Sequence, residues 1–349
     1  MESINEFTDT LFMILNKRIL SYEFWPFWVL YIPAYFYWMY LAIRAKNFTY
    51  FTTLNPLMNN SGAFEVSKWS YLSKFPENWI PKTFKANKET SKRELDQLIQ
   101  SHQISFPIVA KPDDSERGKE VRILNSIDEL DAYFRNSHFE ELLIQEFCAY
   151  ENEAGILFYK LPDESRFEIT SITEKVFCSI QGDGQKTLGY LIRSNIRLKH
   201  RIVFLEKKFK NEWNHILPSG KNLLIEPVGS HNLGTEFRDA RSKITPQLTK
   251  TLKEWSDQLP GFYYGRFDIK FNSWDALEKG EEFKILEVNG VNSEPTHIYQ
   301  SSYGLWKAYR DIFYHMDLIY EISKINKSLG YQTVPVKKFV NGIIRIVTL

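Results

Sequence analysis

Two apolar runs with a polar or charged residue at alternate positions constrain this chain more than any other feature. They are GRFDIKF (265–271) and FKILEVNG (283–290). Successive side chains of a β-strand point to opposite faces. The first run therefore places Arg266, Asp268 and Lys270 on one face and its phenylalanine and isoleucine residues on the other. The pattern predicts a strand with one charged face and one apolar face.

The second run has the same alternation. Glu287 and Asn289 share one face, and Leu286 and Val288 lie on the opposite face. The stretch between the two runs is rich in turn-forming residues, including Gly280, and favours a hairpin loop. Two acids, one amide and one arginine are therefore expected on one surface of a β-hairpin.

Asp268, Glu287 and Asn289 offer hard oxygen ligands. Mg²⁺ is usually held by one or two carboxylates together with the phosphates of a substrate. The pattern therefore predicts a nucleotide site. The alternative interpretation is the solvated face of an amphipathic hairpin, where charges also gather. The residues upstream separate the two interpretations.

Length and composition narrow the classes of function. The 349 residues suffice for two or three compact domains or for one enzyme built from lobes. The 44 Lys and Arg residues nearly balance the 43 Asp and Glu residues, so the charge does not indicate a nucleic-acid partner. Cys148 and Cys178 give no disulfide framework and fit a reducing compartment. The histidines lack the spacing of a zinc site.

The N-terminal segment is unusually aromatic. Residues 24–43 read FWPFWVLYIPAYFYWMYLAI, without a formal charge and long enough to cross a bilayer. Two prolines and many Trp, Tyr and Phe residues are more typical of the headgroup interface than of the acyl core. Three arrangements stay open: a full span, an interfacial or re-entrant anchor, and an aromatic helix packed on the body of the protein.

The remaining chain mixes strand-like and helical segments without strict βαβ order, which predicts α+β lobes. A capping box at Ser126 to Glu129 and a Thr245-Pro246 start each predict a helix. A longer helix is expected from Ser301 to Asn326. Five regions are expected: an aromatic N-terminal helical segment, a lead-in region, a small lobe, a large lobe with the metal and substrate site, and a tail, at residues 1–46, 47–104, 105–180, 181–326 and 327–349.

Two upstream segments suit nucleotide contacts. Lys111 closes the strand-like FPIVAKP and precedes the loop DDSERGKEV. A lysine beside backbone N–H donors commonly holds phosphate oxygens. Glu146 and Glu153 lie seven residues apart, at and after the end of the apolar LLIQEF. There a carboxylate can accept the hydroxyls of a ribose, and a strand edge can bind an adenine through its backbone.

Taken in order, these segments resemble the ATP-grasp superfamily, especially its D-alanine–D-alanine ligase-like and RimK-like carboxylate–amine ligases. The resemblance runs from Lys68 to Tyr299 and is strongest in GRFDIKF…FKILEVNGVNSEP, which is similar to the family's Arg-x-Asp and Glu-x-Asn strands. The stretch QGDGQKTLGYLI also resembles the GDG-x-x-TL segment of RimK-like members. The resemblance implies an α+β, ATP-grasp fold, in which two lobes clasp ATP, with an aromatic helical N-terminal extension.

The resemblance also implies a role for each matching residue. Asp268, Glu287 and Asn289 would hold two Mg²⁺ ions, with Mn²⁺ as the alternative ion. Arg266 would be the catalytic residue that steadies the transferred phosphoryl group. The other matches would contact ATP. They are two lysines at the phosphates, the lysine of the lead-in segment, two residues at the hinge beside the adenine, and one glutamate at the ribose: Lys111, Lys175, Lys68, Glu146, Phe147 and Glu153.

Several features depart from the family's pattern. Glu120 lies in the phosphate loop and would repel a phosphate if it pointed inward. The loop after Asn289 carries Glu294 and His297 where relatives have small residues, which argues against D-alanine as substrate. These two residues, together with His231, are candidate substrate-binding residues. The aromatic N-terminal segment has no counterpart in the soluble ligases.

The expected function is an ATP-dependent carboxylate–amine ligase that uses Mg²⁺ and forms an acyl phosphate. Its partners would be a small-molecule acid and a small-molecule amine. A phosphotransferase on the same fold and a low-turnover, membrane-associated ATP-binding scaffold are the two alternatives. ATP and reduced thiols indicate a cytoplasmic site, and residues 24–43 would hold the protein at the inner face of a membrane.

Overall fold

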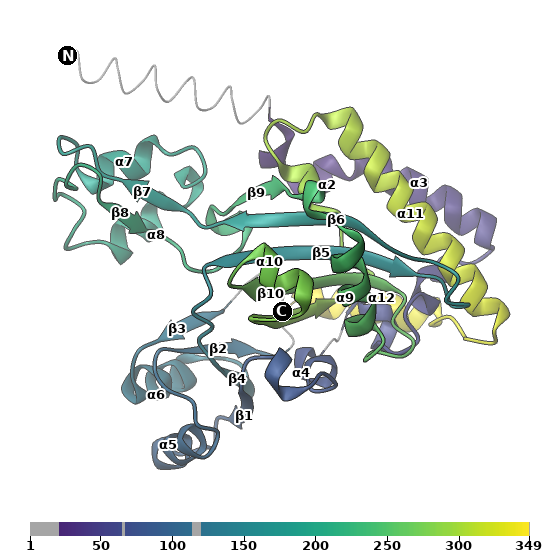
Figure 1. The fold of residues 1–349 in the computed structure, drawn as a ribbon, viewed down its shortest axis with the longest axis horizontal. Helices are drawn as coiled ribbons and strands as arrows, with labels where there is room; N and C mark the ends of the chain where they lie inside the picture. The colour runs from purple at the N-terminus through teal and green to yellow at the C-terminus, as the bar shows by residue number, and fades with distance from the viewer. Residues whose placement is uncertain (1–20, 65–66, 114–119, 349) are drawn as a thin grey trace.

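The computed structural model describes residues 21–64, 67–113 and 120–348. Within these residues the chain forms a four-stranded sheet, a five-stranded sheet and a two-stranded sheet, all antiparallel, with helices around them (Figure 1). The mixture of helices and antiparallel sheets confirms the expected α+β class.

The small lobe is built on the four-stranded sheet. Its elements are β1 (Thr83–Asn87), α5 (Lys92–Ser101), β2 (Ile108–Pro112), β3 (Arg122–Leu124), α6 (Ile127–Asn136) and β4 (Glu141–Glu146). The strands lie in the order β1-β4-β2-β3. Leu95 and Ile99 of α5 and Leu130 and Phe134 of α6 pack on the apolar side chains of the sheet. The amphipathic helices thus give this lobe a core of its own.

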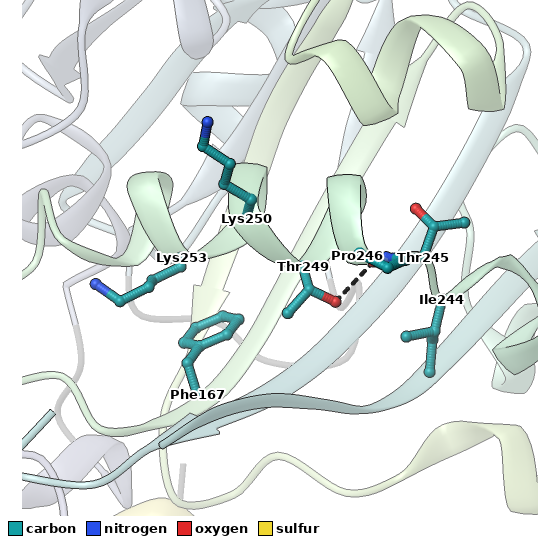
Figure 2. A pocket seen from close by; sticks show the side chains of 7 residues that line it. All are labelled: Phe167, Ile244, Thr245, Pro246, Thr249, Lys250 and Lys253. Carbon is teal, nitrogen blue, oxygen red and sulfur yellow. Dashed lines mark hydrogen bonds between the residues drawn. The ribbon is translucent and has the colours of Figure 1, made fainter. Parts of the chain in front are cut away.

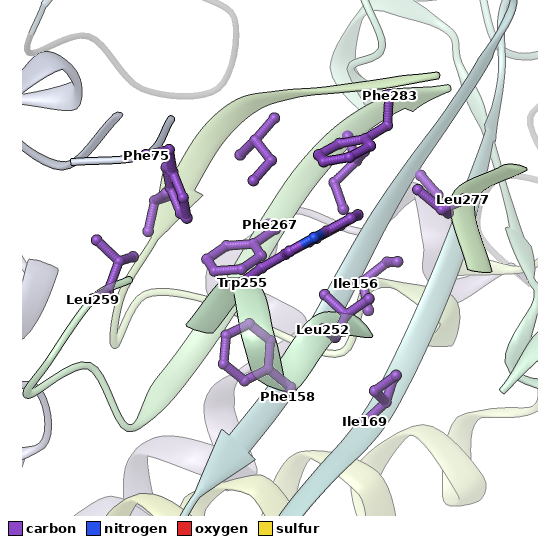
Figure 3. Packing of buried hydrophobic residues seen from close by; sticks show 14 of the residues in the cluster. Phe75, Ile156, Phe158, Ile169, Leu252, Trp255, Leu259, Phe267, Leu277 and Phe283 are labelled. Atoms are coloured by element: carbon purple, nitrogen blue, oxygen red, sulfur yellow. The ribbon is translucent and has the colours of Figure 1, made fainter. Parts of the chain in front are cut away.

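The large lobe is built on the five-stranded sheet, in the order β11-β10-β5-β6-β9. Its elements are β5 (Asn152–Lys160), β6 (Phe167–Val176), β9 (Glu236–Asp239), α9 (Pro246–Ser256), β10 (Tyr264–Phe271), α10 (Trp274–Lys279) and β11 (Phe283–Asn289). In its core the Trp255 ring stacks on Phe283 at 4.0 Å between centroids, and Phe158 lies edge-on to Phe267 at 4.8 Å (Figure 3). The apolar faces of β10 and β11 point into this core, so their polar faces are turned the other way.

A third unit is inserted between β6 and β9. It contains β7 (Ser179–Gln181), α7 (Leu188–Ser194), α8 (Ile202–Lys208) and β8 (Asn222–Leu224). Leu198, Trp213 and Ile225 belong to its separate hydrophobic cluster. In Figure 1 it projects from one end of the large-lobe sheet. Strands β6 and β9 still pair directly, from Thr173 opposite Asp239 to Val176 opposite Glu236.

The N-terminal segment packs on the body of the protein. Its helices α2 (Phe27–Leu30) and α3 (Ile32–Ala45) lie along the long helix α11 (Leu305–Ser328) (Figure 1). Leu30 and Ala34 join a cluster with Ile312 of α11, and Leu41 joins one with Tyr320. Of the three arrangements left open by the sequence, the packed aromatic helix is the one observed.

The opposite face of the same segment is exposed. Phe36 is 69% exposed, whereas Leu41 on the buried face is 0% exposed. The other large apolar side chains exposed along this face are Phe27, Trp28, Ile32, Tyr35, Met39, Tyr40 and Ile43. Within the described ranges, no helix is both long enough and apolar enough to cross a membrane.

Short helical elements complete the architecture. The helix α4 (Lys68–Leu72) contacts β11, and α12 (Val336–Thr348) ends the described chain. The 3₁₀ helices are η1 (Tyr22–Phe24), η2 (Tyr50–Thr53), η3 (Asn59–Gly62), η4 (Glu77–Trp79), η5 (Lys199–Arg201), η6 (His231–Leu233), η7 (Arg241–Lys243) and η8 (Thr296–Tyr299).

The lobes are divided differently from the sequence-based expectation. Strand β1 and helix α5, expected in the lead-in region 47–104, belong to the small lobe because β1 pairs with β4. Strands β5 and β6, expected in the small lobe 105–180, lie inside the large-lobe sheet. Strand partners far apart in the chain decide which lobe a segment joins, and a local pattern does not contain that information.

Two further expectations are corrected. The hairpin loop between β10 and β11 contains the helix α10, which Ser273 caps at its start and Gly280, with φ +72°, ends. The region 327–349, expected as a tail, contains α12, where Phe339 lies edge-on to Phe51 at 5.3 Å and to Phe64 at 5.5 Å. Through Phe339, helix α12 therefore packs on aromatic rings from the N-terminal half of the chain.

Candidate functional site

The predicted metal-binding residues meet on neighbouring strands. β10 and β11 pair so that Asp268 lies opposite Glu287 and Arg266 lies opposite Asn289. Since directly opposed residues of an antiparallel pair present their side chains on the same face, the two acids, the amide and the arginine share one surface. This juxtaposition was predicted from the alternation in the sequence.

Asp268 is the centre of this surface. It is 5% exposed, and its carboxylate accepts hydrogen bonds from Arg266 Nε at 2.8 Å and Nη2 at 3.1 Å. Lys175 Nζ lies 3.5 Å away, and Asn289 Nδ2 lies at 3.4 Å. Burial by itself raises the pKa of Asp268, but the charges of Arg266 and Lys175 outweigh it and lower the pKa below its usual value. The carboxylate is therefore ionised at neutral pH.

A glycine makes room for this cluster. Gly155 lies opposite Asp268 on β5. A Cβ atom at this position would stand 2.9 Å from Arg266 Cδ and 3.0 Å from Asp268 Oδ1. A strand interior disfavours glycine unless another group approaches closely. Here the side chains of the site take up that space.

Glu287 differs from Asp268 in having no partner. The half-buried carboxylate makes no hydrogen bond or ion pair with any of the described residues. An ionised group in such a position lacks the compensation that burial normally requires. Its oxygens, with those of Asp268 and the Oδ1 atom of Asn289, fit the ligand chemistry of Mg²⁺.

The protein supplies only part of a metal's coordination shell. Among residues 21–64, 67–113 and 120–348, no group of three or more His, Cys, Asp and Glu side chains is arranged to hold a metal ion. Two carboxylates and one amide fit an ion that takes its remaining ligands from substrate phosphates and water, as Mg²⁺ does.

Lys175 and Glu153 extend the charged cluster along the sheet. Lys175 Nζ donates to Glu153 Oε1 at 2.8 Å, and both side chains are buried. Burial lowers the pKa of Lys175, but Asp268 and Glu153 outweigh it and raise the pKa. A Cβ atom on Gly229 would come within 2.4 Å of Glu153 Oε1, so this pair is also tightly enclosed. The predicted ribose and phosphate contacts thus lie directly beside the predicted metal site.

Two lysines reach this surface from the side of the small lobe. Lys111, on β2, donates to the carbonyl oxygen of Leu286 on β11 at 3.4 Å. Lys68, at the start of α4, donates to the carbonyl oxygen of Asp113 at 3.3 Å. Burial lowers the pKa of Lys111 to about 8, although the charge of Glu287 opposes the shift. Lys111 is thus within electrostatic reach of Glu287 and Asp268, and its phosphate contact stays a prediction.

The titration of Lys111 gives a testable prediction. We expect ATP affinity to fall as the pH rises through about 8, because Lys111 is charged below its lowered pKa and neutral above it. Losing a charge-assisted hydrogen bond costs about 1.5–3 kcal/mol, which is roughly a 10- to 150-fold weaker Kd. Isothermal titration calorimetry on both sides of this pKa measures the change.

Lys111→Arg is the matched control, since a guanidinium stays charged over the whole range. Its pH profile should be flat, and Lys111→Ala should bind weakly at every pH. A pH dependence that is identical in the wild type and Lys111→Arg would remove Lys111 from the phosphate site.

The hinge residues lie where the chain passes from the small lobe to the large lobe. Glu146 ends β4, where its Oε1 accepts a hydrogen bond from the backbone N–H of Lys82 at 3.1 Å. The Phe147 ring lies under Lys270 Nζ, which is 5.7 Å from the ring centroid. Lys270 also donates to the carbonyl oxygen of Tyr150 at 3.0 Å. Lys270 thus connects the hinge to β10, the strand that also carries Arg266 and Asp268.

The phosphate-loop residues 114–119 lie outside the described residues. Glu120, at the end of this loop, has its carboxylate 3.7 Å from Arg122 Nη2. Glu120, which would repel a phosphate if it pointed inward, is therefore paired with an arginine of β3.

No protein-family model matches the chain, and no curated protein matches it either. Among solved structures it is similar to a bifunctional glutathione synthetase from Pasteurella multocida, with 11% identity over 67% of this chain and 34% of that chain, and a TM-score of 0.35.

Two other solved structures are similar. One is the D-alanine–D-alanine ligase from Coxiella burnetii, with 9% identity over 84% of this chain and 64% of that chain, and a TM-score of 0.43. The other is the ATP-grasp ligase PsnB with a minimal precursor, with 10% identity over 72% of this chain and 60% of that chain, and a TM-score of 0.37. The chain spans 34% to 64% of the length of these structures, and likenesses at this level say nothing of its reaction.

The three candidate substrate residues have different surroundings. Glu294 is half-buried in the loop that follows β11. His231 has its Nε2 atom 3.6 Å from Glu23 Oε2. His297 is 1% exposed, with Nδ1 bonded to Ser171 Oγ at 2.7 Å and Nε2 bonded to Asp311 Oδ2 at 3.0 Å. Both nitrogens of His297 are thus occupied inside the protein.

Several residues near these candidates were missed by the sequence reading. Tyr31 and Tyr299 donate hydrogen bonds to Glu294, and Glu23 accepts one from Arg197 at 2.8 Å. Tyr31 and Glu23 come from the aromatic N-terminal segment. The sequence contains no signal for the contact of Tyr31 with Glu294 or of Glu23 with Arg197, because each joins residues more than 170 positions apart.

A separate groove lies on the outer side of the large lobe. It runs between β6 and the first turns of α9, where Thr249 Oγ1 donates to the carbonyl oxygen of Thr245 at 2.8 Å (Figure 2). None of the predicted site residues lines this groove, whose walls are formed by Phe167, Ile244, Thr245, Pro246, Thr249, Lys250 and Lys253. The charged surface of β10 and β11, where the predicted site residues meet, is the candidate site.

Proposed function

We propose that this protein is an ATP-dependent ligase that joins a carboxylate to an amine through an acyl phosphate, with Mg²⁺ as cofactor. The unpartnered carboxylate of Glu287, opposite Asp268 and within the electrostatic reach of Lys111, is the observation that carries the proposal. An acid left without a protein partner among cations suits a site that a metal ion and a polyphosphate complete.

The first step transfers the γ-phosphoryl group of ATP to the substrate carboxylate. Phosphoryl transfer depends mainly on positioning and on neutralising charge. Lys111 and Lys175 would bind phosphate oxygens, and Arg266 would contact the transferred group. Mg²⁺, held by Asp268, Glu287 and Asn289, would neutralise phosphate charge. ADP leaves, and the acid becomes an acyl phosphate.

The second step forms the C–N bond. The amine attacks the carbonyl carbon of the acyl phosphate, and inorganic phosphate leaves through a tetrahedral intermediate. Arg266 is placed to stabilise the oxyanion of that intermediate, since its guanidinium is held rigidly by two hydrogen bonds to Asp268.

An ADP-release assay over pools of carboxylates and amines tests the proposal, with hydroxylamine present to trap acyl phosphates. We expect ADP release that depends on a carboxylate, together with a hydroxamate of that carboxylate. Omitting the carboxylate is the control. A complete absence of hydroxamate over all pools would contradict the proposal.

Two alternatives give other outcomes in the same assay. A phosphotransferase would release ADP with a hydroxyl acceptor and form no hydroxamate. A scaffold would bind ATP without releasing ADP. The scaffold was favoured by Glu120 in the phosphate loop, and the ion pair of Glu120 with Arg122 weakens that argument.

We also infer that the exposed face of α2 and α3 contacts a membrane surface. Trp, Tyr and Phe side chains favour the headgroup layer, and the exposed Arg44 and Lys46 at the end of α3 would face anionic lipids. Replacing Trp28, Phe36 and Ile43 together with Gln should abolish co-sedimentation with vesicles that contain an anionic phospholipid. A wild-type protein that stays in the supernatant would refute this contact.

A further inference from the structure

The carboxylate of Glu294 is held by two tyrosines from distant parts of the chain. Tyr299, in η8, donates its hydroxyl to Glu294 Oε2 at 2.8 Å, and Tyr31, between α2 and α3, donates to the same oxygen. Burial, and then the negative charge of Glu294, raise the pKa of Tyr31 well above its ordinary value. Tyr31 therefore stays protonated, and its hydroxyl, like that of Tyr299, is a donor to the acceptor carboxylate.

The other oxygen of this carboxylate has no such partner. Among the described residues, none donates a hydrogen bond to Glu294 Oε1, and no Lys, Arg or His side chain forms an ion pair with Glu294. Glu294 is half-buried, and the charge of Arg266 interacts with it without forming an ion pair. The free oxygen Oε1 is therefore an acceptor that a cationic group of a ligand can contact directly.

Glu294 lies close to the reacting groups of the proposed site. It follows Asn289 by five residues, and Ser293 Oγ bonds back to the Asn289 carbonyl oxygen at 2.8 Å. Burial lowers the pKa of Arg266, and Asp268, Glu287 and Glu294 together raise it above its usual value. The negative charge of Glu294 thus interacts with the guanidinium of Arg266, which in the proposed function contacts the transferred phosphoryl group.

The N-terminal segment that supplies Tyr31 is itself fixed to the same region. The Tyr22 hydroxyl donates to the carbonyl oxygen of Ile298, next to Tyr299. Glu23 accepts a hydrogen bond from Arg197 at 2.8 Å, and both side chains are largely buried. Leu30 and Ala34, before and after Tyr31 in the chain, join a hydrophobic cluster with Ile298. The Tyr31 contact is therefore part of the packed structure.

We propose that Glu294 binds the amine substrate as its ammonium ion and removes the proton that must leave before the amine attacks, and that Tyr31 is a positioning residue for this carboxylate. The inference rests on the proposed ligase function. Oε1 accepts an N–H of the ammonium group and takes its proton, which frees the nitrogen lone pair. The lone pair forms the C–N bond with the acyl carbon, the C–O bond to phosphate breaks, and phosphate leaves with the bonding electrons.

Glu294→Gln distinguishes the binding and deprotonation of the amine from the formation of the acyl phosphate that precedes it. Glutamine keeps the size of the side chain but cannot bind an ammonium ion as a counter-charge or accept its proton. We expect the KM for the amine to rise roughly 10- to 100-fold, as for the loss of a charge-assisted hydrogen bond, and the KM for the carboxylate to stay unchanged. Hydroxamate formation should also stay unchanged, because hydroxylamine is mostly uncharged at neutral pH.

The outcomes distinguish the two proposals. Without hydroxamate in the wild type, the ligase function fails. If the wild type forms hydroxamate and Glu294→Gln has the wild-type KM for the amine, the role of Glu294 is refuted. A variant that loses hydroxamate formation, or whose KM rises for the carboxylate instead, also refutes it, since Glu294 would then act before the amine enters.

Tyr31→Phe tests the contribution of the N-terminal segment, with Tyr37→Phe as its matched control. Tyr37 lies in α3, the helix that follows Tyr31, and also donates to a carboxylate, that of Asp317, at 2.8 Å. We expect Tyr31→Phe to raise the KM for the amine roughly 3- to 10-fold, as for one lost hydrogen bond, with the KM for the carboxylate unchanged. Equal effects of the two variants on the KM for the amine would show that Tyr31 has no positioning role.

Discussion

Glu287→Gln is expected to lower the rate of ADP formation roughly 10³-fold or more, because a metal ion at a transferring phosphoryl group is worth several kcal/mol. The carboxylate forms no hydrogen bond or ion pair with the described residues, so its loss removes only its longer-range attraction to Lys111 and Arg266. The free energy of unfolding should therefore stay near that of the wild type. ADP release over a Mg²⁺ titration and urea unfolding measure the two quantities.

Glu281→Gln is the matched control, since Glu281 is exposed just before β11. It should release ADP at the wild-type rate. Near-normal turnover of Glu287→Gln at saturating Mg²⁺ would refute the metal assignment.

Asp268→Asn is expected to abolish ADP formation as well, but with a different effect on stability. It would remove the counter-charge that Arg266 and Lys175 share in a buried position. Leaving buried charges uncompensated costs about 3–5 kcal/mol. A variant that is inactive and less stable than Glu287→Gln agrees with this structure.

Deleting residues 1–46 is expected to prevent correct folding of the chain. The segment buries Leu30, Ala34, Leu41 and Ala42 against the rest of the protein. Truncating one such leucine to alanine costs about 2–5 kcal/mol, and the total stability of a domain is only about 5–15 kcal/mol. We expect the truncated protein to aggregate on expression, and solubility after fractionation measures this.

Two point variants on one helix control for the deletion. Leu41→Ala should lower the free energy of unfolding by about 2–5 kcal/mol, because Leu41 is 0% exposed. Phe36→Ala should change it by no more than about 0.5 kcal/mol, because Phe36 is 69% exposed. A soluble truncated protein with the unfolding midpoint of the full chain would contradict the observed packing.

Features encoded within a few residues could be predicted from the sequence. The helix that begins after Ser126 has Ser126 as its N-cap, and Thr245 caps the helix that begins at Pro246. The alternation in β10 and β11 correctly brought Asp268 and Glu287 to one surface. In each case the determining interaction lies within one element or within one hairpin.

Features that join distant segments could not be predicted. The assignment of β1 to the small lobe depends on its pairing with β4, more than fifty residues later. The contact of Tyr31 with Glu294 spans 263 residues. The aromatic composition of the N-terminal segment fits both a membrane surface and a protein interior, since both environments favour large apolar rings, and only the packing against α11 distinguishes its two faces.

The separately cored unit between β6 and β9 has a consequence for how such a protein can diversify. Because β6 and β9 pair directly, the unit is attached like a loop and can change in length without altering the register of the large-lobe sheet. It nevertheless carries Arg197, which contacts Glu23 of the N-terminal segment. Substitutions in this unit can therefore change its contact with the N-terminal segment while the acids on β10 and β11 keep their places.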